Sequence, residues 1–163
     1  MMRKLLSILL AAVVCGFIVW QIASCQESPR LPGKPQTGLP TCTMKLGGRS
    51  FTLEIAATDA RRQKGLMFRQ SMPADHGMIF VYAEADALPF WMKNTYIPLD
   101  IVYVGADQRI VSIHQLIPHD ETGVYSKGPA RWAIELNKDT ASKLGLKPGD
   151  LLDIPASAAR SLD

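Results

Sequence analysis

The distribution of hydrophobic residues divides the chain into one long apolar segment and a larger region of short apolar stretches. Residues 5–26 carry no charged side chain and follow a short basic head that contains Arg3 and Lys4. A basic head followed by a continuous apolar run is the pattern of an export signal. From residue 41 onward, short apolar stretches alternate with glycine, proline and asparagine turn signals, which is typical of β-strands.

The short stretches predict about eight strands and two short helices. Gly47 and Gly48 separate the first two strands and favour a tight hairpin turn. Thr58 is a favourable N-cap and Gly65 a favourable C-terminal stop for a helix over residues 59–65. The expected strands cover residues 41–46, 50–57, 78–83, 88–94, 99–105, 109–115, 131–137 and 151–154.

Together these elements predict an α+β domain of mainly antiparallel strands: a compact barrel-like sheet with two short helices, folded as a single domain over residues 42–154. The second helix is expected to be capped by Asp139, and residues 117–129 are expected to form a long loop. The expected strands and helices do not alternate regularly, so a doubly wound fold is not expected. The last residues, 155–163, are expected to form a loose tail.

The end of the apolar segment carries a candidate lipidation site. Residues 22–25 are Ile-Ala-Ser-Cys and resemble the lipobox of bacterial lipoproteins, in which the cysteine, here Cys25, is lipidated. Residues 1–24 are then a signal peptide, and residues 25–41 an extended linker rich in proline and glycine. An uncleaved transmembrane anchor is the alternative, and both place the domain outside the inner membrane. Gln26 replaces the aspartate that retains many lipoproteins at the inner membrane, which favours the outer membrane in a Gram-negative cell.

The charge of the mature chain gives no argument for nucleic-acid binding. Two of the 18 basic residues lie in the leader, so residues 25–163 contain 16 basic and 15 acidic side chains. A nucleic-acid-binding domain is expected to be far more basic. Besides Cys25, the mature chain contains only Cys42, whose place in a predicted strand indicates a buried packing residue rather than a nucleophile.

Residues 90–95 are the richest candidate binding segment. In a strand, the indole of Trp91 and the ammonium group of Lys93 point to one face, opposite Phe90 and Met92. Such a pair can stack on a sugar ring or hold an anionic group. In the structural alternative, Trp91 only packs and Lys93 neutralises a buried acid.

Two acidic residues, Asp100 and Glu135, lie in unusually apolar predicted strands. Unpaired burial of a carboxylate is costly, so each is expected to be solvated or paired, with Arg69 and Lys93 as the obvious partners. One interpretation is a structural ion-pair network. The other is a shared cleft in which the two carboxylates act as general acid and general base.

Thioether and imidazole groups add copper handling as a further hypothesis. The candidate ligands are Met67, Met72, Met78, Met92, His76, His114 and His119. Their scattered positions and apolar neighbours favour core packing, so no metal and no cofactor is predicted. The sequence also contains no phosphate-binding glycine loop, no Gly-x-Ser-x-Gly elbow, no paired-cysteine motif and no His-Glu-x-x-His, which argues against nucleotide-binding, serine-hydrolase and zinc-protease functions.

Six short motifs follow one another in a fixed order along the domain. They are GLMFR at 65–69, GMIF at 77–80, FWMKNT at 90–95, IPLDI at 97–101, AIEL at 133–136 and GD at 149–150. In this order they resemble the motifs of a widespread prokaryotic family, the domain of unknown function family 192. The resemblance implies a small β-rich domain, often exported, with no established activity. Residues 137–140, Asn-Lys-Asp-Thr, replace the alanine-glycine pair that members usually carry before the threonine.

The sequence therefore predicts an exported envelope lipoprotein that is held at the membrane by its lipid anchor. Its small domain is expected to bind a glycan, a peptide or another envelope component, and no nucleic acid. The candidate binding residues are Arg69, Trp91, Lys93, Asn94, Asp100 and Glu135. The alternatives are an envelope hydrolase or transferase that uses Asp100 and Glu135 as acid and base, and a copper handler built of methionine and histidine.

Overall fold

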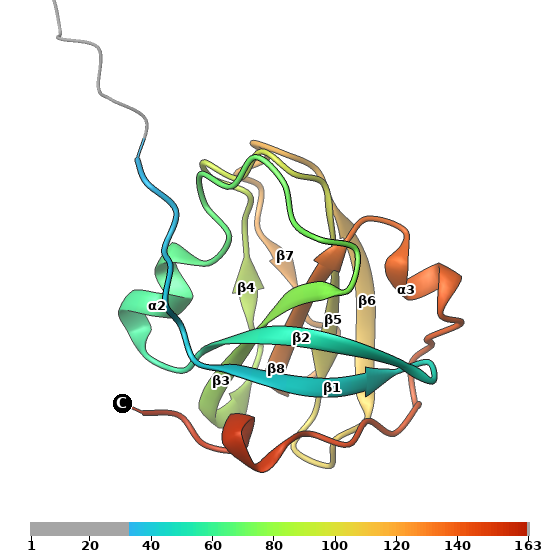
Figure 1. Cartoon of the computed structure of the whole chain (residues 1–163). Helices are drawn as coiled ribbons and strands as arrows, with labels where there is room; N and C mark the ends of the chain where they lie inside the picture. The colour runs from blue at the N-terminus through green and yellow to red at the C-terminus, as the bar shows by residue number, and fades with distance from the viewer. Residues whose placement is uncertain (1–32, 163) are drawn as a thin grey trace, which may run out of the picture. The chain divides into compact units, whose positions relative to one another are not determined.

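A computed structural model of the protein describes residues 33–162 (Figure 1). The predicted signal peptide, the predicted lipidation site at Cys25 and the predicted linker up to residue 32 lie outside the described residues. Among residues 33–162, none of the helices has the length and apolarity needed to cross a membrane.

Six strands form one sheet in the spatial order β1-β2-β3-β8-β5-β6. Neighbouring strands are antiparallel except β2 and β3, which are parallel and are connected through α2. The strands of this sheet are β1 (Thr41–Leu46), β2 (Arg49–Ala56), β3 (His76–Asp86), β5 (Leu99–Val104), β6 (Ile110–Leu116) and β8 (Ala130–Asn137). The remaining elements are α2 (Asp59–Lys64), β4 (Pro89–Phe90), β7 (Val124–Tyr125), α3 (Thr140–Lys143) and a 3₁₀ turn at Ala156–Ala158.

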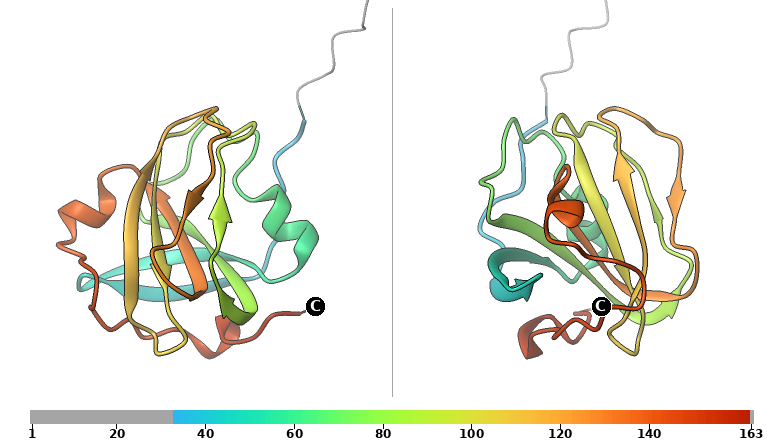
Figure 2. Two further views of the ribbon diagram at one scale, coloured as in Figure 1. Left: turned by 180° about the vertical axis from the view of Figure 1, so that it is seen from behind. Right: turned by 90° about the vertical axis from the view of Figure 1, so that its right-hand side faces the viewer.

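The predicted α+β class is confirmed, with mainly antiparallel strands, two short α-helices and a single domain. The sheet curls strongly (Figure 2). Its edge strands β1 and β6 do not pair with each other, so the sheet is open and the expected barrel is not closed. The β2-α2-β3 connection is one βαβ unit within an otherwise antiparallel sheet, which the sequence pattern did not predict.

The first hairpin follows from its two glycines. Gly47 and Gly48 have φ angles of 54° and 80°, a left-handed backbone that glycine adopts without steric cost. Two such residues in succession match the twist of the flanking strands, so Leu46 pairs directly with Arg49. The predicted hairpin is therefore confirmed, and its second strand begins at Arg49, one residue earlier than expected.

The central strands of the sheet are buried on both faces, which explains why their sequences are apolar without alternation. One face, here called the hairpin face, presents Ile79, Val102 and Ile134 to the β1–β2 hairpin and to the C-terminal segment. The other, here called the aromatic face, presents Phe80 and Tyr103 to the short β4–β7 sheet. The short sheet covers this face of the larger one (Figure 2).

Two predicted strands are wrong in extent. The strand expected over residues 88–94 is limited to Pro89–Phe90, because the backbone turns at Asn94, whose φ is 54°. The amide of Met92 then bonds to the carbonyl oxygen of Asp120 at 2.8 Å instead of joining a ladder. The strand expected over residues 151–154 is reduced to a single bridge between Leu151 and Arg109.

Both ends of the described chain pack on the domain. Although a loose tail was predicted, the indole of Trp132 donates to the carbonyl oxygen of Ala158 at 2.8 Å, and Ala158 is fully buried. The linker was expected to stay extended and unpacked. Its last residues instead contact the domain, because the side-chain amide of Gln36 donates to the carbonyl oxygen of Gly65 at 2.8 Å. The linker thus donates to a backbone carbonyl group at the end of α2, whereas the C-terminal segment accepts from a side chain of β8.

Candidate functional site

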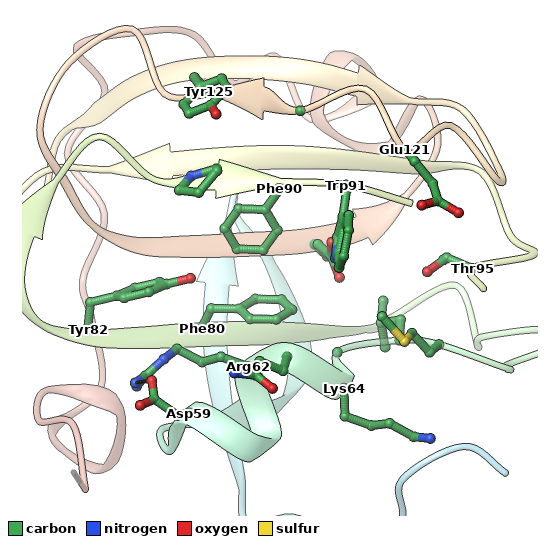
Figure 3. A pocket seen from close by; sticks show the side chains of 17 residues that line it. Asp59, Arg62, Lys64, Phe80, Tyr82, Phe90, Trp91, Thr95, Glu121 and Tyr125 are labelled. Carbon is green, nitrogen blue, oxygen red and sulfur yellow. Dashed lines mark hydrogen bonds and ion pairs between the residues drawn. The ribbon is translucent and has the colours of Figure 1, made fainter. Parts of the chain in front are cut away.

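A pocket of about 530 Å³ opens between α2, strand β3 and the short β4–β7 sheet (Figure 3). Five aromatic side chains line it: Phe80, Tyr82, Phe90, Trp91 and Tyr125. This cavity, called the aromatic pocket below, has the size and the mostly apolar walls of a small-molecule site.

The inner wall of the aromatic pocket is a set of rings packed at steep angles. The centroids of Phe80 and Phe90 lie 4.8 Å apart with the ring planes at 88°, and those of Phe90 and Tyr103 lie 5.7 Å apart at 76°. The hydroxyl of Tyr103 donates to the carbonyl oxygen of Val124 at 2.8 Å. That bond fixes the two-residue strand β7 over the larger sheet, which a ladder of two residues could not do alone.

The outer rim of the pocket consists of exposed aromatic groups. Trp91 is 49% exposed and Tyr125 is 58% exposed, although both side chains are large and mostly apolar. Figure 3 shows Trp91 edge-on between Phe90 and Glu121. The ammonium group of Lys93 lies 5.1 Å from the centre of the Trp91 indole and 4.0 Å from a carboxylate oxygen of Glu121.

The α2 side of the pocket carries charges that already have partners. The guanidinium group of Arg62 bonds to Asp59 at 2.5 Å and to the carbonyl oxygen of Val81 at 2.7 Å, and it lies 4.8 Å from the centre of the Tyr82 ring. Thr58 accepts a hydrogen bond from the first turn of α2, as predicted for its N-cap. The helix is thereby held against β3 at the edge of the pocket.

Glu135 lies on the inner side of the aromatic pocket and is only 4% exposed. On the sheet it is flanked by Met78 of β3 and Ile101 of β5. Within residues 33–162 its side chain has no hydrogen bond or salt bridge. Burial raises the pKa of its carboxyl group from the ordinary 4.5 to about 8, and the Arg69 guanidinium offsets part of that rise. Glu135 is therefore mainly protonated at neutral pH.

Asp100 lies on the opposite face of the sheet and has a structural role. Its carboxylate accepts hydrogen bonds from the backbone amides of Asp139, at 3.1 Å, and Ala141, at 2.8 Å. These amides begin helix α3, so Asp100 is the group that caps this helix from a distant strand. The predicted cap is therefore wrong in one respect. Asp139 occupies the N-cap position, but its own carboxylate makes no capping bond. It accepts a hydrogen bond from the side-chain amide of Gln115 instead.

The predicted pairing of Asp100 with Glu135 in one cleft is wrong. Asp100 pairs across the ladder with Leu136, the residue after Glu135, and neighbouring residues on a strand point to opposite faces. The predicted ion-pair network is also wrong, because its two cations pair with other acids. Arg69 bonds to both carboxylate oxygens of Glu54, at 2.6 and 2.7 Å, and Lys93 lies beside Glu121.

Arg69 belongs to a second, more open pocket of about 700 Å³, which is lined by the linker residues 35–39 and by residues 68–71. Its guanidinium group also donates to the carbonyl oxygen of Gln36 at 3.3 Å. Asn94 supports the same region through its backbone, since its carbonyl oxygen accepts from the amide of Phe68 at 2.8 Å. Of the six predicted binding residues, only Trp91 and Glu135 line the aromatic pocket, and Lys93 lies next to it.

The sulfur and imidazole groups are dispersed. Met78 and Met92 are buried in the core of the aromatic face, and His114 packs edge-on against Tyr103. Within residues 33–162, no group of three or more histidine, cysteine or acidic side chains could hold a metal ion. Cys42 is buried, as predicted, and burial raises the pKa of its thiol.

Sequence reasoning missed most of the pocket. Phe80 and Phe90 belong to predicted apolar strands. Nothing in the sequence around them distinguishes a residue that lines a pocket from one that is packed in the core. Tyr125 lies in the segment expected to be a long loop, and Tyr82 in a strand whose end becomes exposed. The one available signal was the combination of two tyrosines and a tryptophan flanking apolar strands, which is typical of a half-exposed aromatic surface.

The fold and the pocket define a small, open-sheet α+β domain with one aromatic cavity. The chain belongs to the DUF192 family, described as Uncharacterized ACR, whose family model matches residues 42–154. No curated protein gives a significant match.

Two solved structures are similar to this chain. One is a protein of unknown function from Novosphingobium aromaticivorans DSM 12444, with 38% identity, a TM-score of 0.68, and coverage of 77% of this chain and 94% of that one. The other, provisionally assigned as a transcription regulator, comes from Sinorhizobium meliloti 1021. It has 37% identity and a TM-score of 0.68, and the match covers 72% of this chain and 96% of that one.

Proposed function

We propose that the domain is a binding module that takes a small, partly apolar ligand in the aromatic pocket. The observation that carries the proposal is a buried carboxyl group without a described partner, Glu135, at the inner side of a cavity with five aromatic side chains. A buried polar group that lacks a protein partner is costly, and a ligand that supplies the partner lowers that cost.

The rim supports the same proposal. Trp91 and Tyr125 expose large aromatic surfaces at the mouth of the cavity, where they can close over a ligand with little loss of side-chain entropy. Other exposed apolar residues, such as Ile117 and Leu151, lie outside the pocket lining. They provide matched positions for control substitutions.

The provisional assignment of one relative as a transcription regulator has less support in this chain. The α-helices of residues 33–162 span six and four residues. A helix that reads bases in the major groove needs more exposed length than either provides. The near-neutral charge of residues 25–163 supplies no electrostatic attraction to DNA either.

Binding is tested by following the intrinsic fluorescence of the domain, residues 33–163, while chitotriose and short peptides are titrated in. We expect a saturable change that depends on Trp91. Trp91→Ala should weaken binding about tenfold or more, because truncation of an aromatic anchor removes much of the contact area. Ile117→Ala is the matched control and should bind as the unmodified domain does. Unchanged affinity in Trp91→Ala would show that the ligand binds elsewhere.

We further propose that the domain works outside the inner membrane, anchored through lipid on Cys25. The proposal rests on the basic head, the apolar run and the lipobox-like residues 22–25. Cys25→Ser should abolish metabolic labelling with a radioactive fatty acid and leave a precursor of higher mass. Cys15→Ser, a change within the same apolar run, should leave labelling intact. Equal labelling of both variants would contradict a lipid anchor at Cys25.

A further inference from the structure

The carboxyl group of Glu135 has no cation of its own. The cation that acts on it is Arg69. Both terminal nitrogens of that guanidinium group are bonded to Glu54, and its buried Nε has no hydrogen-bond partner among the described residues. Arg62, on the wall of the same pocket, is bonded to Asp59 and to a backbone carbonyl group. An ionised Glu135 would therefore face the cavity with its charge uncompensated by a direct contact within residues 33–162.

The rings around Glu135 provide the complementary surface for a positive charge. Phe80 and Phe90 meet at 88°, so the face of one ring lies beside the edge of the other and the two form a corner. Ring faces carry the negative part of the aromatic quadrupole and attract cations. Two nearby lysines contact rings other than Phe80 and Phe90: Lys64 lies 4.3 Å from the centre of Phe68, and Lys93 lies 5.1 Å from that of Trp91 at the rim of the pocket.

We propose that the aromatic pocket binds an organic cation, a primary or quaternary ammonium group, which pairs with Glu135 and is surrounded by the faces of the aromatic rings. This inference rests on the proposed binding function and narrows its ligand class. Aromatic rings combined with one carboxylate form the usual environment for such ligands. A neutral glycan is the competing occupant, and it is separated from the cation by the test below.

Binding of a cation is coupled to the protonation of Glu135. Since burial raises the pKa of Glu135 to about 8, the empty pocket is mostly neutral at pH 7. A bound ammonium group stabilises the carboxylate and releases the proton to solvent. Binding of a neutral ligand releases no proton, because such a ligand contacts the protonated carboxyl group of Glu135 without ionising it.

The other titratable groups near Glu135 change little in the same range. Burial raises the pKa of Tyr82 on β3 to about 12 and also raises that of Tyr103 on β5. His114 on β6 pairs with Ile101, the neighbour of Glu135, and burial lowers the pKa of His114 below 6.5. The other charged groups on the pocket wall are Asp59, Arg62, Lys64 and Glu121. Above pH 7, the linkage is therefore expected to report on Glu135.

The test compares choline and butylammonium with 3,3-dimethyl-1-butanol, the uncharged analogue of choline, by calorimetric titration of the domain. We expect both cations to bind at least about tenfold more tightly than the neutral analogue at pH 9, and their affinity to fall about tenfold between pH 9 and pH 7. Titrations at pH 7 in two buffers of different ionisation enthalpy should show release of close to one proton.

Glu135→Gln keeps the shape of the protonated acid and removes its charge. This variant should lose the preference for cations and the pH dependence, whereas Glu84→Gln, an exposed change on β3, should retain both. Equal affinity for cation and neutral analogue, no binding of either cation, or unchanged binding in Glu135→Gln would overturn the cation inference. The binding function itself fails only if the glycan and peptide titrations also give no Trp91-dependent signal.

Discussion

The two faces of the sheet each bury one acid, and they treat it in opposite ways. On the hairpin face, Asp100 is 2% exposed and its two carboxylate oxygens accept the first amides of helix α3. On the aromatic face, Glu135 is 4% exposed and opens on a cavity, with no hydrogen bond or salt bridge in residues 33–162. Only one ladder position separates the two residues.

The comparison shows that burial of a charge does not by itself identify its role. The carboxylate of Asp100 accepts hydrogen bonds from two fixed backbone donors, so its burial is compensated within the fold. Glu135 lacks that compensation and is kept in the protein at a cost to stability. Because the fold does not recover the cost of burying Glu135, a ligand is expected at this residue. The compensated burial of Asp100 indicates a structural role instead.

Replacing each acid by its amide should therefore have opposite effects, and the larger effect is expected at Glu135. The folded carboxyl group takes up its proton below about pH 8, whereas in the unfolded chain it does so below about 4.5. The unmodified protein thus loses stability as the pH rises from 4.5 to 8, and this loss is complete above pH 8. Glu135→Gln should be more stable by up to about 5 kcal/mol at pH 9 and nearly equal at pH 4.

Urea unfolding of both proteins at several pH values measures this difference. The change in free energy of unfolding between the two proteins should grow between pH 4.5 and 8 and then stay constant. Glu84→Gln, on the exposed part of β3, should follow the unmodified protein throughout. A difference that does not vary with pH would mean that Glu135 is ionised or paired in the folded domain, and the contrast with Asp100 would disappear.

The amide substitution at Asp100 should destabilise the domain. Asn can accept only through its single carbonyl oxygen, and its NH₂ group then faces one of the amides of Asp139 and Ala141. Loss of a charged acceptor and of one buried hydrogen bond should lower the free energy of unfolding by about 2–4 kcal/mol at pH 7. Asp153→Asn, on an exposed residue, is the control.

Ligand binding separates the two acids further. At a temperature where Asp100→Asn remains folded, its affinity for a pocket ligand should equal that of the unmodified domain, because Asp100 lies on the other face. An unchanged melting temperature in Asp100→Asn, or a loss of binding without a loss of stability, would remove the structural role assigned to this residue.

The sequence was sufficient for the fold class because the signals there are local. The glycine pair at residues 47–48 set the first hairpin, and Thr58 set the start of α2. The strands of the centre were found from apolar runs alone. The closure of the sheet could not be found this way, since it depends on whether β1 meets β6, two strands far apart in the chain.

The candidate site was predicted only in part, because alternation along a strand fixes the face of a residue only if the strand exists. Trp91 and Lys93 were assigned to one face of a strand that ends at Phe90. Asp100 and Glu135 were grouped because both are acids in apolar strands, but the register that places them on opposite faces depends on pairing between distant segments. Chemical type was visible in the sequence, and the direction of each side chain was not.

The smallest expected effect concerns the loop that receives the Asp100 cap. Asp139 has a φ of 64°, in the left-handed region that glycine adopts without steric cost. Asp139→Ala should lower the free energy of unfolding by about 1 kcal/mol, since alanine tolerates this backbone less well and the bond from Gln115 is lost. Asp139→Gly should stay within about 0.5 kcal/mol of the unmodified protein, because relief of strain offsets the added chain entropy. Thermal unfolding of the two variants measures the contrast, and equal destabilisation by both would show that the side-chain bond, not the backbone, holds the loop in the position that Asp100 caps.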